Sequence, residues 1–205
     1  MSHKHDKRGH SVLYVLEETQ VWATVGACHD LIDRIIIKSP LFLGGLRVGE
    51  MTHMGDDWIT SEGKFRIPSF MPCNCAECAR VRDGGWKPKT PAGARILYVP
   101  KLLREDLAEL FKAQPYGLDI SRQAIWYRTK RILKEAKVRF RGLSGDTGFS
   151  HCLRATCATM LAATDINEVA LCYYMGWSDI NQAKPYIQMV RGQTGAFKWA
   201  KELFG

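Results

Sequence analysis

The stretch that decides the fold lies in the C-terminal half, where His151-Cys-Leu-Arg154 is followed by Gly176-Trp177-Ser and then by Tyr186. His151 and Arg154 are three residues apart, so a helix places both on one face. A guanidinium stays charged and binds phosphate in a bidentate manner, an indole N–H is a single donor, and a phenol becomes a nucleophile when it is activated. Taken singly, each residue is more often structural than functional. Their combination points to a site that grips and attacks a phosphodiester.

A second arginine, far upstream, completes this set of groups. In Gly-Gly-Leu-Arg47-Val-Gly-Glu50, a helix beginning near Leu46 places Arg47 and Glu50 one turn apart on the same face. Cleavage of a phosphodiester without a metal requires cations on the non-bridging oxygens, an in-line nucleophile and a proton for the leaving oxygen. Because Arg47 and Arg154 are far apart in sequence, each can approach the phosphate from a different part of the domain.

In order and spacing, these segments resemble the motifs of the tyrosine recombinase (phage integrase) family. The segment around Arg47 is similar to the first box of that family, residues 151–154 to its His-x-x-Arg box, and Trp177 to its Gly-(His/Trp)-Ser/Thr position. Tyr186 follows Trp177 by nine residues, the interval expected for the family's nucleophile. The boxes extend over nearly the whole chain.

The resemblance implies a recombinase or integrase domain that cleaves and rejoins DNA through a 3′-phosphotyrosyl intermediate, with no cofactor in the chemical step. It also implies double-stranded DNA as the partner and a homo-oligomer on DNA, a tetramer at synapsis. The source would be a mobile element such as a virus or plasmid. The implied site residues are Tyr186 as nucleophile, Arg47, His151, Arg154 and Trp177 as ligands of the scissile phosphate, and Glu50 as a buttress.

The family also has a lysine that protonates the leaving 5′ oxygen, in a hairpin where this chain has Trp86-Lys87-Pro-Lys89-Thr90. Alternation along a strand places Lys87 and Lys89 on one face, so the pattern alone does not choose between them. We prefer Lys89, which adjoins the turn at Pro91-Ala-Gly93.

The predicted fold is a mainly α domain with a small antiparallel β-sheet inserted early. Residues 17–37 have helical periodicity and predict one long helix or two short ones, ended by Pro40 and Gly44-Gly45. The expected strands are residues 58–60 and 64–67 as one pair, and 86–90 and 94–99 as a second pair.

From Lys101 onward the pattern is helical, with a core-facing stripe of leucines and Phe111. Ser121 is expected to cap a basic helix, and Ser150 to cap a helix that ends near residue 163. Asp165 with Glu168 resembles a capping box for the next helix. Pro185 is expected to interrupt the segment that holds Tyr186 and so to let this tyrosine swing into and out of the site.

The expected organisation is a polar tail (1–11), a catalytic domain (12–190) with a cysteine-bearing insertion (68–85), and a C-terminal helix (191–205). The tail is too short to form the DNA-clamping domain that recombinases usually carry. The amphipathic stretch 197–204 is expected to pack either on its own domain or on a neighbouring protomer.

The chain is basic, with 29 Lys and Arg against 21 Asp and Glu and a formal charge of +8. Between residues 121 and 141 the bias sharpens, because Glu135 is the single acid. Such a stripe suits phosphate binding with release of counterions, although a solvated helix face has the same composition. The candidate DNA-binding residues are Arg122, Arg128, Lys130, Arg131 and Lys134.

Seven cysteines form an odd set in a chain without an apolar signal core, which disfavours a disulfide framework. Cys73-Asn-Cys75-Ala-Glu-Cys78 is spaced closely enough to place three thiolates on a structural zinc. His53 or another cysteine would then be the fourth ligand. The alternative is three reduced thiols in a surface loop.

No apolar run approaches the roughly 20 residues of a membrane helix, so a cytoplasmic, nucleoid-associated protein is expected. Two other functions compete with the recombinase interpretation. One is a non-catalytic DNA-binding protein, either a recombinase relic or a zinc-stabilised regulator. The other is DNA relaxation by a mechanism like that of type IB topoisomerases, which uses similar Arg, Lys and Tyr chemistry.

Overall fold

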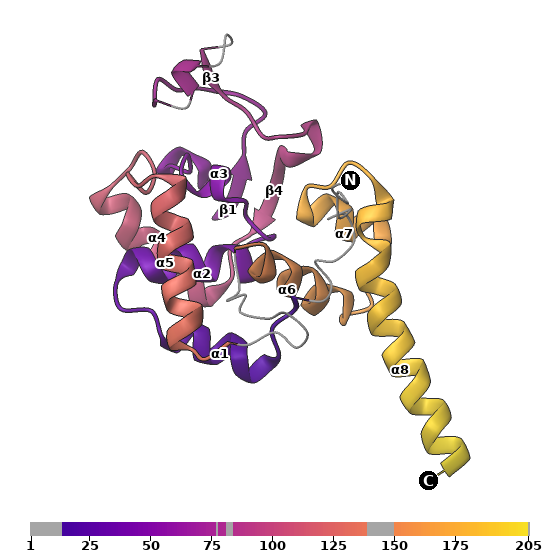
Figure 1. The fold of residues 1–205 in the computed structure, drawn as a ribbon. Helices are drawn as coiled ribbons and strands as arrows, with labels where there is room; N and C mark the ends of the chain where they lie inside the picture. Colours follow the sequence, from indigo (N-terminus) through magenta and orange to yellow (C-terminus); the bar gives the residue numbers. More distant parts are fainter. Residues whose placement is uncertain (1–13, 77, 81–83, 139–149, 205) are drawn as a thin grey trace, which may run out of the picture.

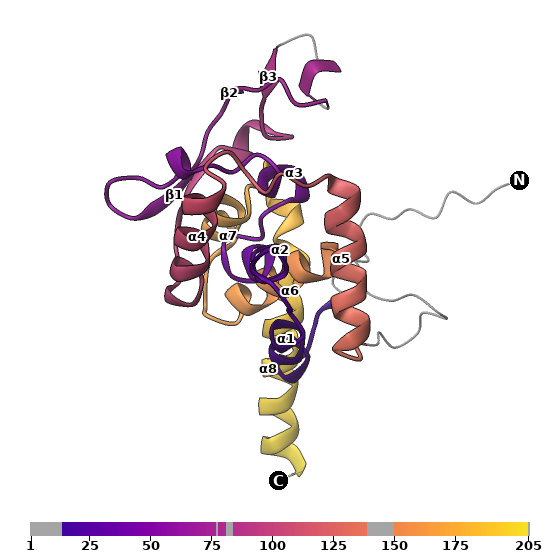
Figure 2. The ribbon, with the colours of Figure 1, turned by 90° about the vertical axis from the view of Figure 1, so that its left-hand side faces the viewer.

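The computed structural model describes residues 14–76, 78–80, 84–138 and 150–204, and side chains at 150, 194–200 and 202–204 are outside this description. Figures 1 and 2 show a helical body from which two parts project at opposite ends. One is the segment with β2 (Met71–Pro72) and β3 (Gly85–Trp86), and the other is the C-terminal part of α8 (Lys184–Phe204). The predicted polar tail, residues 1–11, lies outside the described residues.

The N-terminal periodic segment forms two helices, α1 (Glu18–Gly26) and α2 (Leu31–Phe42). Asp30 caps α2 by accepting a hydrogen bond from the backbone N–H of Asp33 at 2.7 Å. Residues 35–37, three consecutive isoleucines, are fully buried, because α2 packs against α4, α5 and α6. Pro40 lies inside α2 and does not end it, contrary to prediction; the chain leaves the helix just before Gly44 and Gly45, which both have positive φ.

The predicted strand pairing is confirmed only in part: Ile59 forms an antiparallel bridge with Phe65, whereas the predicted pair of 86–90 with 94–99 does not form. After α3 (Val48–Met51), residues 56–58 form a 3₁₀ turn, η2, rather than a strand. β1 (Lys64–Ile67) pairs antiparallel with β4 (Arg95–Tyr98), and β2 pairs with β3, so the first strand joins the last. β3 ends at Trp86, before Pro88, which has no N–H to donate to a ladder. Local alternation identifies strands, but their partners are set by burial, here that of Phe65 opposite Leu97.

The second half is helical, as predicted. Ser121 caps the basic helix by accepting from the backbone N–H of Ala124 at 3.1 Å. Asn167, and not Asp165, caps the helix after α6; its side chain accepts from the N–H of Ala170 at 2.8 Å. The elements are η3 (Cys78–Arg80), η4 (Pro91–Gly93), α4 (Lys101–Ala113), α5 (Arg122–Glu135), α6 (Ser150–Ala162), α7 (Glu168–Met175) and η5 (Ile180–Gln182).

Pro185 begins a helix rather than interrupting one. It is the second residue of α8, and Tyr186 follows in the same first turn. This correction has a simple cause, since the missing N–H of proline falls among the N–H groups that have no intrahelical partner. α8 is continuous through residue 191, where a separate helix had been expected to begin. None of the described helices combines the length and apolar character that crossing a bilayer requires.

Candidate active site

Arg47 and Glu50 form a closed unit at the start of α3. Arg47 is the N-cap residue, and its backbone N–H donates to Glu50 Oε2 at 2.7 Å. The Arg47 guanidinium donates through Nη1 to Glu50 Oε1 at 3.1 Å and through Nη2 to the carbonyl of Gly176 at 2.9 Å. The structure therefore joins the first sequence box to the residue just before Trp177.

Glu50 is buried between two arginines, and the second of them, Arg95, was missed by the sequence analysis. Arg95 has a fully buried side chain that donates to both Glu50 carboxylate oxygens, at 3.1 and 3.3 Å. Burial opposes ionisation of Glu50, but the charge and hydrogen bonds of Arg95, and then Arg47, more than offset it and hold its pKa below the ordinary value. A signal existed: Arg95 shares the inward face of β4 with Leu97 and Val99.

Arg154 lies on α6 and is almost completely buried, at 8% exposure. Its Nη1 and Nη2 groups donate to the carbonyls of Gly45 and Met175. Burial, followed by the charge of Arg47, lowers the pKa of Arg154 to about 9, so it stays charged at neutral pH. Gly45 must be a glycine, since a Cβ there would lie 2.5 Å from Met175 Cε and 2.9 Å from Arg154 Cγ.

Three arginines thus bind three consecutive carbonyls at the end of α7. Arg95 Nε donates to the carbonyl of residue 174 at 3.0 Å, Arg154 to that of residue 175, and Arg47 to that of residue 176. The last carbonyls of a helix have no intrahelical partner and carry the negative end of its dipole. This helix end therefore gathers three cations at one place.

Trp177 and Tyr186 continue this cluster. The Cζ atom of Arg154 lies 5.5 Å from the centroid of the Trp177 ring, and the Trp177 and Tyr186 rings stack at 5.4 Å with an angle of 18°. Tyr186 is buried, with 5% exposure, in a small core formed by α6, α7 and α8. The order Arg154, Trp177, Tyr186 is therefore a continuous series of contacts.

His151 lies one turn before Arg154 on α6. Partial burial, followed by the charges of Arg154, Arg47 and Lys89, lowers the pKa of His151. Lys89 is exposed, as is Lys87, in the connection between β3 and η4. Lys89 therefore lies within electrostatic range of His151.

The basic helix α5 is not uniformly open to a ligand. Arg128 contacts Asp30 and Asp33, each at 2.8 Å, and Arg131 contacts Asp33 at 2.5 Å. These acids come from the start of α2, far away in sequence, so the sequence did not predict the ion pairs. Of the other candidates, the Lys130 ammonium lies 4.5 Å from the Trp126 ring centroid, Arg122 lies against Gly49, and Lys134 is exposed.

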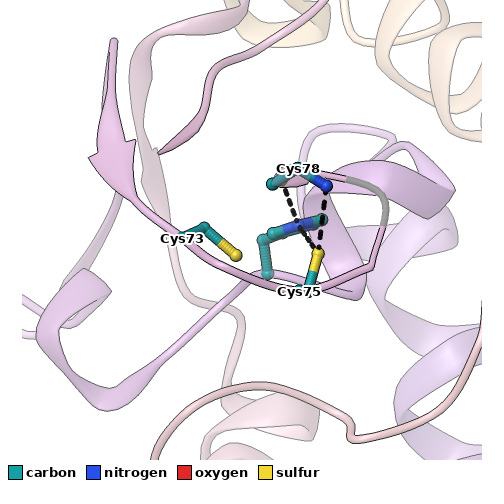
Figure 3. A group of neighbouring side chains, drawn as sticks. Cys73, Cys75 and Cys78 are labelled. Carbon is teal, nitrogen blue, oxygen red and sulfur yellow. Dashed lines mark hydrogen bonds between the residues drawn. The ribbon is translucent and has the colours of Figure 1, made fainter. Parts of the chain in front are cut away.

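A second cluster lies where β2 and β3 meet the end of α3. Figure 3 shows Cys73, Cys75 and Cys78 close together. Their sulfur atoms and one ring nitrogen of His53 all lie within 4.8 Å of one another. This group has the composition and proximity of a metal-binding site, and of the fourth ligands considered from sequence, His53 is the residue the structure places there.

Solved structures of recombinases share this fold. XerA recombinase superposes with a TM-score of 0.64 at 13% identity, over 89% of this chain and 63% of that one. XerH site-specific recombinase, in a post-cleavage complex with palindromic difH substrate, superposes with a TM-score of 0.67 at 15% identity. The superposition covers 96% of this chain and 56% of the XerH chain. Tn1549 transposon integrase, in complex with transposon right end DNA, superposes with a TM-score of 0.62 at 18% identity. The superposition covers 93% of this chain and 66% of the integrase chain.

No protein-family profile and no curated protein sequence matches this chain. The structural likeness shows that the chain has the tyrosine recombinase catalytic-domain fold, a mainly α fold with small antiparallel sheets, as predicted. The chain spans less than two thirds of the length of XerA and XerH, and 66% of the Tn1549 integrase chain.

Proposed function

We propose that this domain is the catalytic part of a tyrosine-type site-specific recombinase, which cleaves and rejoins double-stranded DNA through a 3′-phosphotyrosyl intermediate at Tyr186. The observation that carries the proposal is the continuous cluster of Arg47, Arg154, Trp177 and Tyr186, which come from separate elements. The fold supports it, as does the presence of DNA in the XerH and Tn1549 integrase structures.

In the proposed reaction, Arg47 and Arg154 bind the non-bridging oxygens of the scissile phosphate. Each guanidinium has five N–H donors, and those not used for Glu50 or the backbone carbonyls remain for the phosphate. His151 and the Trp177 indole N–H add donors. A preorganised donor of this kind contributes about 10²–10³ in rate when it meets charge that develops in the transition state.

The covalent step exchanges one phosphoester for another. The Tyr186 oxygen forms a bond to phosphorus and gives its proton to solvent, while the bond from phosphorus to the 5′ oxygen breaks. Lys89 donates the proton that the leaving oxygen takes up. Attack by the 5′ hydroxyl of another strand reverses these steps, so rejoining consumes no nucleotide. Side chains alone perform the proposed chemistry.

Access of DNA to Tyr186 requires a movement. The ring is buried and stacked on Trp177, so the phenol has to leave this position, or Trp177 has to shift, before in-line attack. Tyr186 sits in the first turn of α8 after the short η5 turn, and a helix end rearranges at a lower cost than a helix interior.

Assembly on DNA belongs to the same proposal. The C-terminal part of α8 projects from the body, as Figures 1 and 2 show. We assign this part to docking on a neighbouring protomer within a homo-oligomer, a tetramer at synapsis. Its alternative, packing on its own domain, would require a bend in α8.

A covalent-trapping experiment tests the proposal. Wild-type protein is incubated with nicked att-type DNA, which prevents religation, and conjugates are detected on a denaturing gel. Tyr186→Phe is expected to abolish the adduct and to retain DNA binding in a gel shift. Tyr173→Phe, at an exposed tyrosine on α7, is the matched control and is expected to form the adduct.

Three outcomes would contradict the proposal. An adduct that persists in Tyr186→Phe would exclude this nucleophile. DNA binding by the wild type without any adduct, on DNA that contains its cognate site, would favour a recombinase relic. Relaxation of supercoiled DNA by monomers, without recombination of paired sites, would favour the topoisomerase-like reaction.

A further inference from the structure

We infer that His53, Cys73, Cys75 and Cys78 form a structural zinc site that fastens the β2–β3 segment to the end of α3. Three thiolates and one imidazole are a donor set that structural zinc sites use. Thiolate ligands also disfavour the hard cations Mg²⁺ and Ca²⁺. Figure 3 shows the three cysteines of this group in the projecting segment.

Two pairs of ligand atoms already have the separation of a tetrahedral centre. His53 Nε2 lies 3.5 Å from Cys75 Sγ and 3.3 Å from Cys78 Sγ. Zinc bonds of about 2.3 Å to sulfur and about 2.0 Å to nitrogen, at tetrahedral angles, imply an S···N separation of about 3.5 Å. A metal ion therefore fits with small adjustments of side chains.

The orientation of His53 suits a metal ligand. Its Nδ1 lies 2.8 Å from the carbonyl of Gly49, an acceptor, so the Nδ1–H donates there and the Nε2 lone pair faces the thiols. The ring is also held by stacking on Trp86, with centroids 5.3 Å apart. His53 is buried, at 6% exposure, so this arrangement is not that of a mobile surface histidine.

The backbone ladder of the projecting segment is short. β2 and β3 pair over two positions only, and an isolated two-stranded ladder is marginal in water. The inferred site joins Cys73 and Cys75, just after β2, and Cys78, in η3, to His53, just after α3. A metal at this point would therefore supply a crosslink between three parts of the chain.

The crosslink also has a consequence for the reaction, and this consequence depends on the proposed function. His53 stacks on Trp86, and Lys89 follows three residues after Trp86 in the connection that leaves β3. On the other side, His53 bonds the carbonyl of Gly49, the residue before Glu50. The metal thus has a positioning role, in that it fixes the lysine-bearing connection relative to the Arg47–Glu50 unit.

Metal analysis of the full chain, purified without a histidine tag from zinc-supplemented medium, tests the inference. About one zinc per chain is expected, with a fall of at least about tenfold in Cys75→Ser. Cys28→Ser, at a half-buried cysteine after α1, is the control and is expected to keep its zinc. Metal bound by the N-terminal histidines, His3, His5 and His10, would survive the Cys75→Ser change.

Two further measurements do not depend on how the variants fold. Cobalt-substituted wild type is expected to show the visible absorption of a tetrahedral thiolate centre. Chelation is expected to increase hydrogen exchange in residues 71–86 more than in α2. Absence of zinc from freshly purified wild type, or an intact mass that shows a disulfide among these cysteines, would overturn the inference.

The two proposals fail separately. Metal content and hydrogen exchange are measured without DNA, and the covalent adduct is measured at Tyr186. Zinc without an adduct would leave the metal site standing, whereas an adduct without zinc would leave the recombinase standing.

Discussion

Replacement of Arg95 by methionine tests whether the buried ion pair holds the site together. The change keeps much of the aliphatic stem but removes every donor of the guanidinium. Glu50 would keep only Arg47 as an ionic partner, and the carbonyls of Gly44, Gly93 and Tyr174 would each lose a hydrogen bond.

The magnitude follows from burial. Loss of one partner from a fully buried pair costs about 3–5 kcal/mol, because the other charge stays in place without compensation. In a domain of 150–250 residues, each kcal/mol lowers Tm by about 2–4 °C, so the expected fall is roughly 6–20 °C. Arg66→Met is the matched control: it lies on the paired strand β1 but is exposed, and its expected effect is within about 0.5 kcal/mol.

Urea unfolding at two pH values checks the reasoning. In the wild type, the depressed pKa of Glu50 contributes stability above the unfolded pKa of about 4.3, and this stability is lost as the pH falls. The gap between wild type and Arg95→Met should therefore be largest near neutral pH and narrow towards about pH 4. A loss below about 1 kcal/mol at neutral pH, or a gap that widens on acidification, would refute the account.

Three other predictions concern the rest of the molecule. His151→Gln should lose less stability than wild type when the pH falls below about 6.5. The pKa of His151 is lower in the folded chain than in the unfolded chain, so protonation favours unfolding of the wild type, and urea titrations measure the difference. Lys134→Ala should reduce the slope of log affinity for DNA against log salt by about 1, whereas Arg128→Ala should mainly lower Tm, because it uncovers the buried Asp33. Truncation after Arg191 should abolish higher-order complexes on DNA in gel shifts and retain single-protomer binding; unchanged assembly would contradict docking by α8.

Local patterns were enough to predict most of the helices. Ser121 caps its helix as expected, and the spacing of Trp177 and Tyr186 brought their rings into contact. These features depend on residues that are close in sequence, where geometry is fixed by the helical period. The proximity of Arg47 to residue 176 came from the family resemblance, because no local pattern links positions so far apart.

The features that sequence reasoning missed depend on long-range partners. In the sequence, Arg95 looks like an ordinary arginine of a strand, and only the structure shows that it contacts Glu50. In the sequence, Arg128 looks like an unpaired cation, and only the structure shows its ion pair with Asp33 of α2. The second strand pair was predicted wrongly for the same reason, since alternation indicates which face of a strand is buried but not which strand lies beside it. The sequence did not identify the fourth residue of the cysteine cluster, because His53 lies 20 residues before Cys73 and on another element.

The end of α7 explains how the cluster keeps its cations together. Like charges repel, and the charge of Arg47 lowers the pKa of Arg154 after the effect of burial. The carbonyls of residues 174–176 and the carboxylate of Glu50 offset this repulsion with partial and full negative charge. Both arginines are thus held by acceptors that are fixed in the fold, so that in the proposed reaction a phosphate would meet donors already in place. Trp177 follows these carbonyls directly, and its position over Arg154 is therefore a consequence of where α7 ends.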